Sequence, residues 1–148
     1  HVFSPPVPHP QIVPIIDGKV VLEGVIAMAR ACLENDIPVG LGTDTGCPYV
    51  THYDMWRELC YFVKYCGVTP AFALHSATLL NARLAGIDSV TGSVEAGKAA
   101  DLIVCDRDPL ADLSALRSLH MVIKDGVRIE HPTVKKLPEV ERELDKFL

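Results

Sequence analysis

Long apolar runs are absent from this sequence, and so are clusters of basic residues. No run approaches the roughly 20 apolar residues that a membrane-spanning helix requires, so no membrane partner is expected. The net charge is −5 and no Lys/Arg cluster occurs, which argues against a nucleic-acid partner. The first ten residues contain four prolines and lack the apolar core of a signal peptide.

Paired cysteines are also missing. The five cysteines are an odd number, and no two of them have C-x-x-C spacing. This pattern argues against both a disulfide framework and a zinc ribbon, and it predicts a reducing, cytoplasmic location. The chain begins at His1 rather than Met. Either processing has removed a segment, or the chain is a piece of a longer protein.

Several catalytic motifs are missing as well. The sequence has no G-x-S-x-G, no H-x-H and no H-E-x-x-H. Residues Gly92–Lys98 match G-x-x-x-x-G-K, but Ala99 occupies the position where a phosphate-binding loop needs Ser or Thr. A strand, rather than the required helix, is expected to follow. We therefore interpret Gly92 and Gly97 as turn residues.

The residues that are present indicate a globular α/β chain. Hydrophobic residues make up 49% of the 148 positions and charged residues 22%, which is enough apolar material for a core. After the proline-rich first 18 residues, helical and extended patterns alternate. The expected elements are a helix over 19–34, a buried strand over 37–43, a helix from the capping-box sequence Thr51–Asp54 to Gly67, and a helix over 70–85 with Thr69 as its N-cap.

After Gly86 the pattern changes to short strands. Residues 101–105 form an apolar run, and 121–124 and 127–129 flank Asp125-Gly126, a strong signal for a β-hairpin. The residues from Pro138 to Leu148 predict a short charged helix. The chain is therefore expected to be α/β up to about residue 86 and all-β over 90–130.

Asp44 is the strongest candidate for a functional residue. The preceding stretch alternates Ile37, Val39 and Leu41 with small residues and stops at this carboxylate. In α/β proteins the carboxyl ends of strands are where sites are built, and an aspartate there can bind a metal or take a proton. The alternative is an Asp that caps the following turn.

His52 follows Asp44 by eight residues and could face the same pocket. The alternative is a surface histidine near the start of a helix. Cys47 and His52 could in principle form a catalytic Cys–His pair, while Cys47 could equally line the loop that follows Asp44. Asp44 alone cannot form a catalytic zinc site, which usually needs three protein ligands.

Five separate blocks resemble the C-terminal part of the amidohydrolase superfamily, in particular its imidazolonepropionase-like and Xaa-Pro-dipeptidase-like branch. The resemblance covers about residues 20–130 and rests on the order and spacing of the blocks. They are Gly42-Thr43-Asp44, the stretch from Ala73 to Gly86 that contains His75-Ser76-Ala77-Thr78-Leu79-Leu80-Asn81-Ala82, the stretch from Gly92 to Val104, Asp108-Pro109-Leu110, and Val122-Ile123-Lys124-Asp125-Gly126.

The resemblance implies an α/β fold that is the C-terminal part of a (β/α)8 metal-dependent hydrolase barrel, with the C-terminal strands of a flanking β-sandwich. Residues 1–88 would be the partial barrel, 89–131 the sandwich segment and 132–148 a tail helix. The segment 37–43 would be the last barrel strand. An incomplete barrel leaves sheet edges exposed, so we expect an oligomer or completion by the remainder of the same polypeptide.

The resemblance also implies a role for Asp44. In the superfamily, the corresponding aspartate ligates a divalent metal, here expected to be one or two zinc ions, and takes a proton from the attacking water. The other ligands of the family would precede this chain. The expected substrate is a small molecule with an amide, cyclic amide or dipeptide bond. Residues expected to line its pocket are Thr45, Cys47, His52 and Tyr53.

A second hypothesis belongs to another class of protein. The chain could be a free-standing, non-catalytic α/β module for binding or assembly. The absence of most metal ligands from the sequence favours it, and it predicts neither a bound metal nor hydrolysis.

Overall fold

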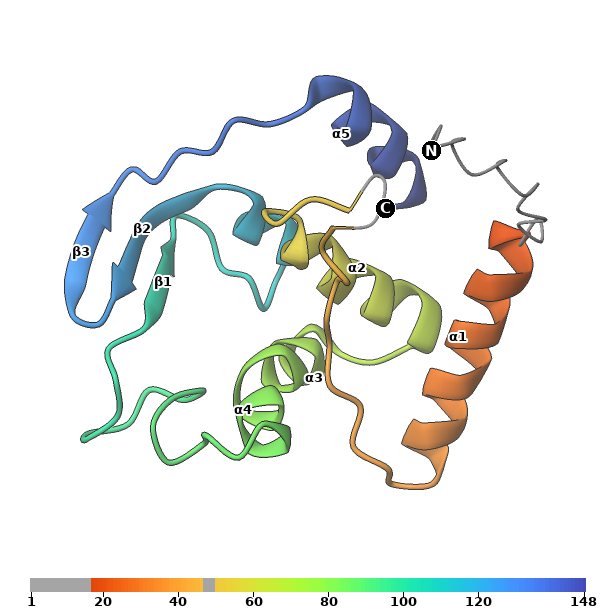
Figure 1. The fold of residues 1–148 in the computed structure, drawn as a ribbon, viewed down its shortest axis with the longest axis horizontal. Coiled ribbons are helices and arrows are strands. Elements are labelled where there is room, and N and C mark those ends of the chain that lie inside the picture. Colours follow the sequence, from red (N-terminus) through yellow and green to blue (C-terminus); the bar gives the residue numbers. More distant parts are fainter. Residues whose placement is uncertain (1–16, 47–49) are drawn as a thin grey trace, which may run out of the picture.

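The computed structural model describes residues 17–46 and 50–148 and divides them between a helical region and a small sheet (Figure 1). The helix α5 follows the sheet in sequence but returns to the helical region, where it lies beside α2. The helical region comprises α1 (Gly18–Glu34), α2 (Met55–Cys66), α3 (Pro70–His75), the π-helical turn η1 (Ser76–Leu80) and α4 (Asn81–Leu84). The remaining elements are β1 (Leu102–Cys105), the 3₁₀ helix η2 (Leu113–Arg117), β2 (Leu119–Lys124), β3 (Val127–Glu130), α5 (Pro138–Leu144) and the 3₁₀ turn η3 (Asp145–Phe147).

Two of the predicted helix ends are confirmed, the start of α3 and the end of α2. Thr69 accepts a hydrogen bond from the Phe72 N–H at 3.2 Å, and Pro70 is the first residue of α3. Gly67 ends α2 in the left-handed conformation, with φ of 74°. The predicted N-cap of α2 is wrong, because Asp54 rather than Thr51 precedes the first turn, and the Thr51 hydroxyl instead donates to the Asp54 carboxylate.

The helix predicted over 70–85 is one continuous run with a π-helical turn at 76–80. Its buried positions carry small side chains, namely Ala73, Ser76 and Ala82. Gly92 lies against this run, where an added Cβ would lie 2.6 Å from the Cβ of Ala82. Gly92 also has φ of 94°, which confirms its interpretation as a turn residue.

The sheet is antiparallel, with strand order β1-β2-β3. Residues 125 and 126 connect β2 and β3, with φ values of 50° and 79°, as the Asp-Gly sequence predicts for a tight hairpin. In the register of this hairpin, Val122 lies opposite Ile129. The prediction of short strands after residue 100 is confirmed.

The predicted strand over 37–43 is not present within the described residues. Residues 37–44 have no strand pairing, and only Thr45 makes an isolated bridge. A strand requires a hydrogen-bonded neighbour, and β1, β2 and β3 pair only with one another. The mixed α/β class agrees with the prediction, whereas the complete barrel and the β-sandwich remain predictions.

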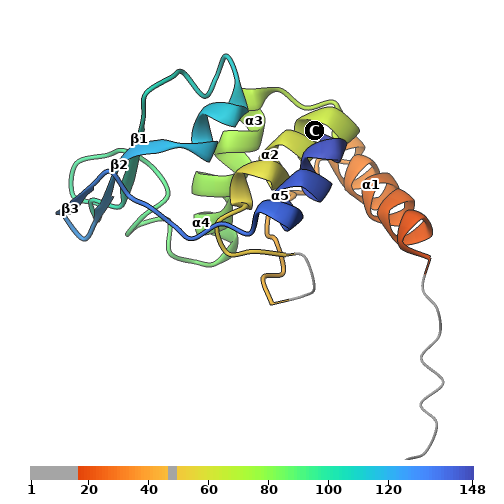
Figure 2. The same cartoon turned by 90° about the horizontal axis from the view of Figure 1, so that it is seen from above.

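The core lies where α2, α3 and η2 meet. Its buried residues include Leu59 and Phe62 of α2 and Leu113 of η2, and the partly buried Val39 and Leu41 pack against them. Viewed from above, α2 lies between α3 and α5, while α1 projects to one side (Figure 2). No residue of α1 is buried. Among residues 17–46 and 50–148, no helix has the length and apolar character needed to cross a membrane.

A buried arginine connects α2 to the C-terminal segment. Arg57 is 2% exposed and faces three carboxylates. Its Nε lies 3.2 Å from Oδ1 of Asp54, its Nη2 lies 3.1 Å from Oε2 of Glu141, and its Nη1 contacts Asp145. Burial opposes the positive charge, but the hydrogen bond to Asp145 and the charges of Asp54 and Glu141 outweigh it and raise the pKa of Arg57.

Candidate active site

Asp44 follows the extended segment 37–43, and the chain turns at Gly46, two residues later. The φ of Asp44, 53°, is in the left-handed region, which Asp tolerates better than most residues because its short polar side chain bonds locally. The hydroxyl oxygens of Thr43 and Thr45, on either side of it, lie 2.7 Å apart in a hydrogen bond. Asp44 itself is exposed. The chain therefore presents a carboxylate at the end of the segment, where the sequence predicts one.

The side chain of Asn81, in α4, hydrogen-bonds the backbone of the segment before Asp44. The Leu41 N–H donates to Oδ1 of Asn81 at 3.0 Å, and Nδ2 of Asn81 donates to the Leu41 carbonyl at 2.8 Å. Nδ2 is also 3.4 Å from the carbonyl of Ala77. The carboxamide thus binds both polar backbone groups of Leu41, as a neighbouring strand would.

Gly40 makes this contact sterically possible. A Cβ at position 40 would lie 2.9 Å from Cδ1 of Leu84 and closer still to Oδ1 of Asn81. Neither Gly40 nor Asn81 was identified as functional from the sequence. A glycine inside an apolar strand pattern is a known sign of close backbone approach, so this signal was available for Gly40.

The residues predicted to surround Asp44 lie in different environments. His52 is exposed and contacts the ring of Tyr53 edge-on, with centroids 5.5 Å apart. The Tyr53 hydroxyl accepts a hydrogen bond from the Leu137 N–H at 2.9 Å, so it anchors the segment that leads into α5. Thr45 is exposed beside Asp44. Cys47 lies outside the described residues.

A small cavity of about 110 Å³ lies close to this segment. Thr43, Asp54 and Tyr61 are among the residues that line it. This volume is well below the roughly 300 Å³ at which ligand pockets begin. Arg57 also lines this cavity, so Thr43, the neighbour of Asp44, and Arg57 border the same space.

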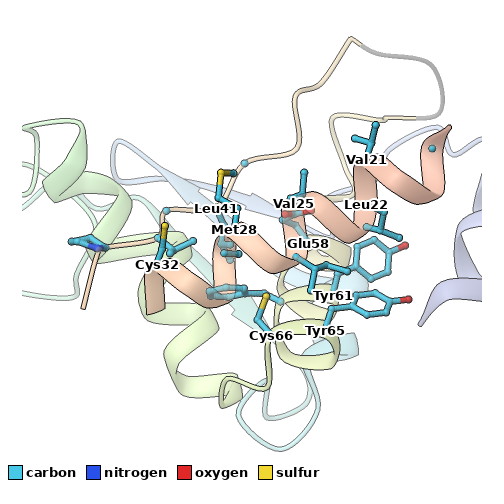
Figure 3. A pocket seen from close by; sticks show the side chains of 18 residues that line it. Val21, Leu22, Val25, Met28, Cys32, Leu41, Glu58, Tyr61, Tyr65 and Cys66 are labelled. Carbon is cyan, nitrogen blue, oxygen red and sulfur yellow. The ribbon is translucent and has the colours of Figure 1, made fainter. Parts of the chain in front are cut away.

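A larger apolar cavity of about 540 Å³ lies between α1, α2 and the segment 38–42 (Figure 3). Glu58 is the acidic residue in its lining, and burial raises the pKa of this carboxyl. Glu58 also lines the smaller cavity. Residues of the larger lining labelled in Figure 3 are Val21, Leu22, Val25, Met28, Cys32, Leu41, Glu58, Tyr61, Tyr65 and Cys66.

The residues in 17–46 and 50–148 do not form a metal site by themselves. No group of three or more His, Cys, Asp or Glu side chains among them is arranged to hold a metal ion. A structural or catalytic zinc site needs at least three protein ligands. Asp44 can supply one oxygen donor, and further donors would have to come from elsewhere.

Comparison with known proteins defines the class to which this chain belongs. The sequence model of the amidohydrolase family matches residues 14–129, which is most of the chain. The chain therefore belongs to the amidohydrolase family. This agrees with the resemblance drawn from the sequence blocks.

The individual relatives are hydrolases. Imidazolonepropionase of Picrophilus torridus is 35% identical over 80 residues, which is 54% of this chain and 20% of that protein. A crystal structure of a Bifidobacterium longum protein, provisionally assigned as a prolidase, has a TM-score of 0.84 at 43% identity and covers 87% of this chain and 32% of that one. A Xaa-Pro dipeptidase with methionine bound in its active site has a TM-score of 0.65 at 36% identity over 72% of this chain and 25% of that one.

The chain spans between a fifth and a third of the length of these relatives. Its likeness to them supports hydrolytic activity in the family to which it belongs.

Proposed function

We propose that the chain forms the C-terminal part of a metal-dependent amidohydrolase that cleaves C–N bonds, and that it is inactive by itself. The observation that carries the proposal is the place of Asp44. It is an exposed carboxylate at the end of a segment that α4 anchors, in a chain of the amidohydrolase family. The 36% identity to a Xaa-Pro dipeptidase supports a C–N bond as the target.

In this proposal Asp44 acts as the general base. It accepts a proton from the attacking water and passes it to the leaving nitrogen, which must be protonated before it departs. Asp44 also donates one oxygen to the divalent metal expected for the family, one or two zinc ions. When bound, that metal lowers the pKa of water towards neutrality.

The substrate is a small molecule with an amide, cyclic amide or dipeptide bond. We propose that residues after Asp44 contact it, namely Thr45, Cys47, His52 and Tyr53. The residues 1–88 contribute to the barrel, 89–131 to a β-sandwich, and 132–148 to a tail helix. The missing donors come from the remainder of the same polypeptide or from another copy, and the location is cytoplasmic.

The test uses the complete polypeptide that the gene encodes, purified and assayed against a Xaa-Pro dipeptide, an N-acyl amino acid and a cyclic amide. We expect turnover of at least one class, loss of turnover after chelation, and recovery on addition of Zn²⁺. A gene that starts immediately upstream of the His1 codon, with no hydrolysis and no bound metal, would instead support the non-catalytic binding module. Turnover that survives complete removal of metal would contradict the proposed chemistry.

A further inference from the structure

Asn81 contacts the backbone of the segment that ends at Asp44. Asn81 contributes one acceptor and one donor to Leu41, at 3.0 and 2.8 Å. In an extended chain the N–H and C=O of one residue point to the same edge. The carboxamide therefore occupies both hydrogen-bonding groups that Leu41 presents on that edge.

We infer that Asn81 is a positioning residue for the Asp44 carboxylate. This inference rests on the proposed function, since it assigns Asn81 to the same site. Leu41 is three residues before Asp44, a distance of about 10 Å along an extended chain. The intervening residues are constrained by the Thr43–Thr45 hydrogen bond and by the positive φ of Asp44. A shift of Leu41 along the segment is therefore transmitted to the carboxylate.

Two features indicate that this contact determines position rather than contributing general stability. Asn81 belongs to the continuous helical run 70–84, and Gly92 lies against this run at Ala82. Gly40 leaves room for the carboxamide, because any larger residue would collide with Asn81 and Leu84.

The experiment compares Asn81→Ala with Asn35→Ala in the complete polypeptide. Asn35 is a matched control, since its Nδ2 also bonds a carbonyl, that of Ala31 at 2.8 Å, but it lies at the end of α1. For Asn81→Ala we expect a fall in kcat of about tenfold or more, as a displacement near 1 Å produces. KM should stay within about twofold of the wild-type value, because uniform substrate binding is not removed.

The second readout is amide hydrogen exchange in the peptide that contains Leu41, measured without substrate. Asn81→Ala should speed this exchange about tenfold, the change that follows when a hydrogen bond worth roughly 1.4 kcal/mol is lost. Asn35→Ala should leave it unchanged. Gly40→Ala should reproduce both effects of Asn81→Ala, because the added methyl displaces the carboxamide.

Asn81→Asp distinguishes positioning from packing. A protonated carboxyl can replace the carboxamide as one donor and one acceptor, whereas the ionised form repels the Leu41 carbonyl. The ratio of its kcat to the wild-type kcat should therefore rise as the pH falls from 8 to 5. Asn81→Ala should show no such rise.

Wild-type kcat and unchanged Leu41 exchange in Asn81→Ala would overturn the inference. A kcat loss that merely follows the fraction of folded protein, with no pH-dependent recovery in Asn81→Asp, would overturn it as well. The variant Asp44→Asn distinguishes failure of this inference from failure of the proposed function. Full activity in Asp44→Asn would show that Asp44 does not belong to the active site, and the proposed function would then fail as well.

Discussion

The two sides of α2 differ in how firmly they hold their neighbours. On one side, α5 and η3 are joined to Arg57 by buried charge, and the Tyr61 hydroxyl donates to the Leu144 carbonyl at 3.3 Å. On the other side, α1 has no buried residue, and its apolar Val20 and Met28 are 63% and 64% exposed. The segment with the candidate carboxylate, 37–46, reaches both sides. Residues 38–42 line the larger cavity with α1, whereas Thr43 lines the smaller cavity with Arg57 and Leu144.

The difference shows how each side of α2 is held. The C-terminal segment is joined to α2 by ion pairs with Arg57, whereas α1 presents exposed apolar side chains. Apolar surface of this kind is the normal sign of a face that packs against further protein. The following substitutions test the contrast.

The largest effect is expected for Arg57→Ala. It leaves the buried carboxylate of Asp54 without a cation and leaves Glu141 and Asp145 with Arg117 alone, which costs about 3–5 kcal/mol. Urea unfolding of the chain can be followed by the fluorescence of its only tryptophan, Trp56, whose ring the guanidinium of Arg57 approaches to 4.5 Å. The control is Arg117→Ala, which removes a 38% exposed side chain and should cost about 1 kcal/mol. Equal losses in the two variants would show that burial of Arg57 is unimportant.

Gly92→Ala should destabilise the chain by about 1–3 kcal/mol. Its methyl would meet the Cβ of Ala82 at 2.6 Å, in a backbone conformation that favours glycine. The matched control is Gly24→Ala on α1, where nothing lies within 4 Å of the added Cβ. That change should stabilise the chain by about 0.5–1 kcal/mol through helix propensity. Shifts in melting temperature of opposite sign relative to the wild type would confirm that Gly92 is closely packed against the run 70–84 whereas Gly24 on α1 is not.

The α2–α5 connection should also weaken in acid. Partial burial works against the Asp145 charge, but hydrogen bonds from Arg57 and Arg117 outweigh it and lower the pKa of this carboxyl. A lowered folded-state pKa gives stability that is complete above the unfolded value, about 3.9, and is lost as the pH falls through the folded value. Because Asp145 is half-exposed, the loss should be about 1 kcal/mol. Asp145→Asn should flatten this part of the pH dependence, and an unaltered pH profile in that variant would contradict the assignment.

The smallest effect concerns Glu58 in the cavity beside α1. Its contribution to stability changes with pH in the direction opposite to that of Asp145. Burial raises the pKa of Glu58 in the folded chain. The contribution of this carboxyl to folding stability is therefore fully present below the unfolded pKa of about 4.3, and it declines as the pH rises through the folded pKa. Glu58→Gln should therefore be slightly more stable than the wild type at pH 7 and no more stable at pH 4. Thermal unfolding at the two pH values measures this difference, and destabilisation at pH 7 would show that the ionised carboxylate has a favourable partner.

The sequence predicts the features that depend on neighbouring residues. Thr69-Pro70, Gly67 and Asp125-Gly126 act within a few positions of themselves, and each occurs at the predicted helix end or hairpin. The contacts that organise the site act over much longer separations. Asn81 bonds a residue 40 positions away, and Arg57 bonds one 88 positions away, so no local pattern could identify either partner.

The error at 37–43 has the same physical origin. Its alternating apolar residues have the character of a strand, but strand pairing also requires a neighbour, which the described residues do not supply. The position of Asp44 at the end of this segment could still be predicted, because it follows from chain order alone. Its role as catalytic base and metal donor remains a prediction.

The most direct test of that role is the pair Asp44→Asn and Asp36→Asn in the complete polypeptide. Both aspartates are exposed and have positive φ, 53° and 56°, so the two substitutions carry the same backbone strain. If Asp44 is the catalytic base, Asp44→Asn should lower kcat by at least about 10²-fold with an unchanged melting temperature, whereas Asp36→Asn should keep wild-type activity. Wild-type turnover in Asp44→Asn, or equal losses in both variants, would contradict the assignment of this carboxylate to the active site.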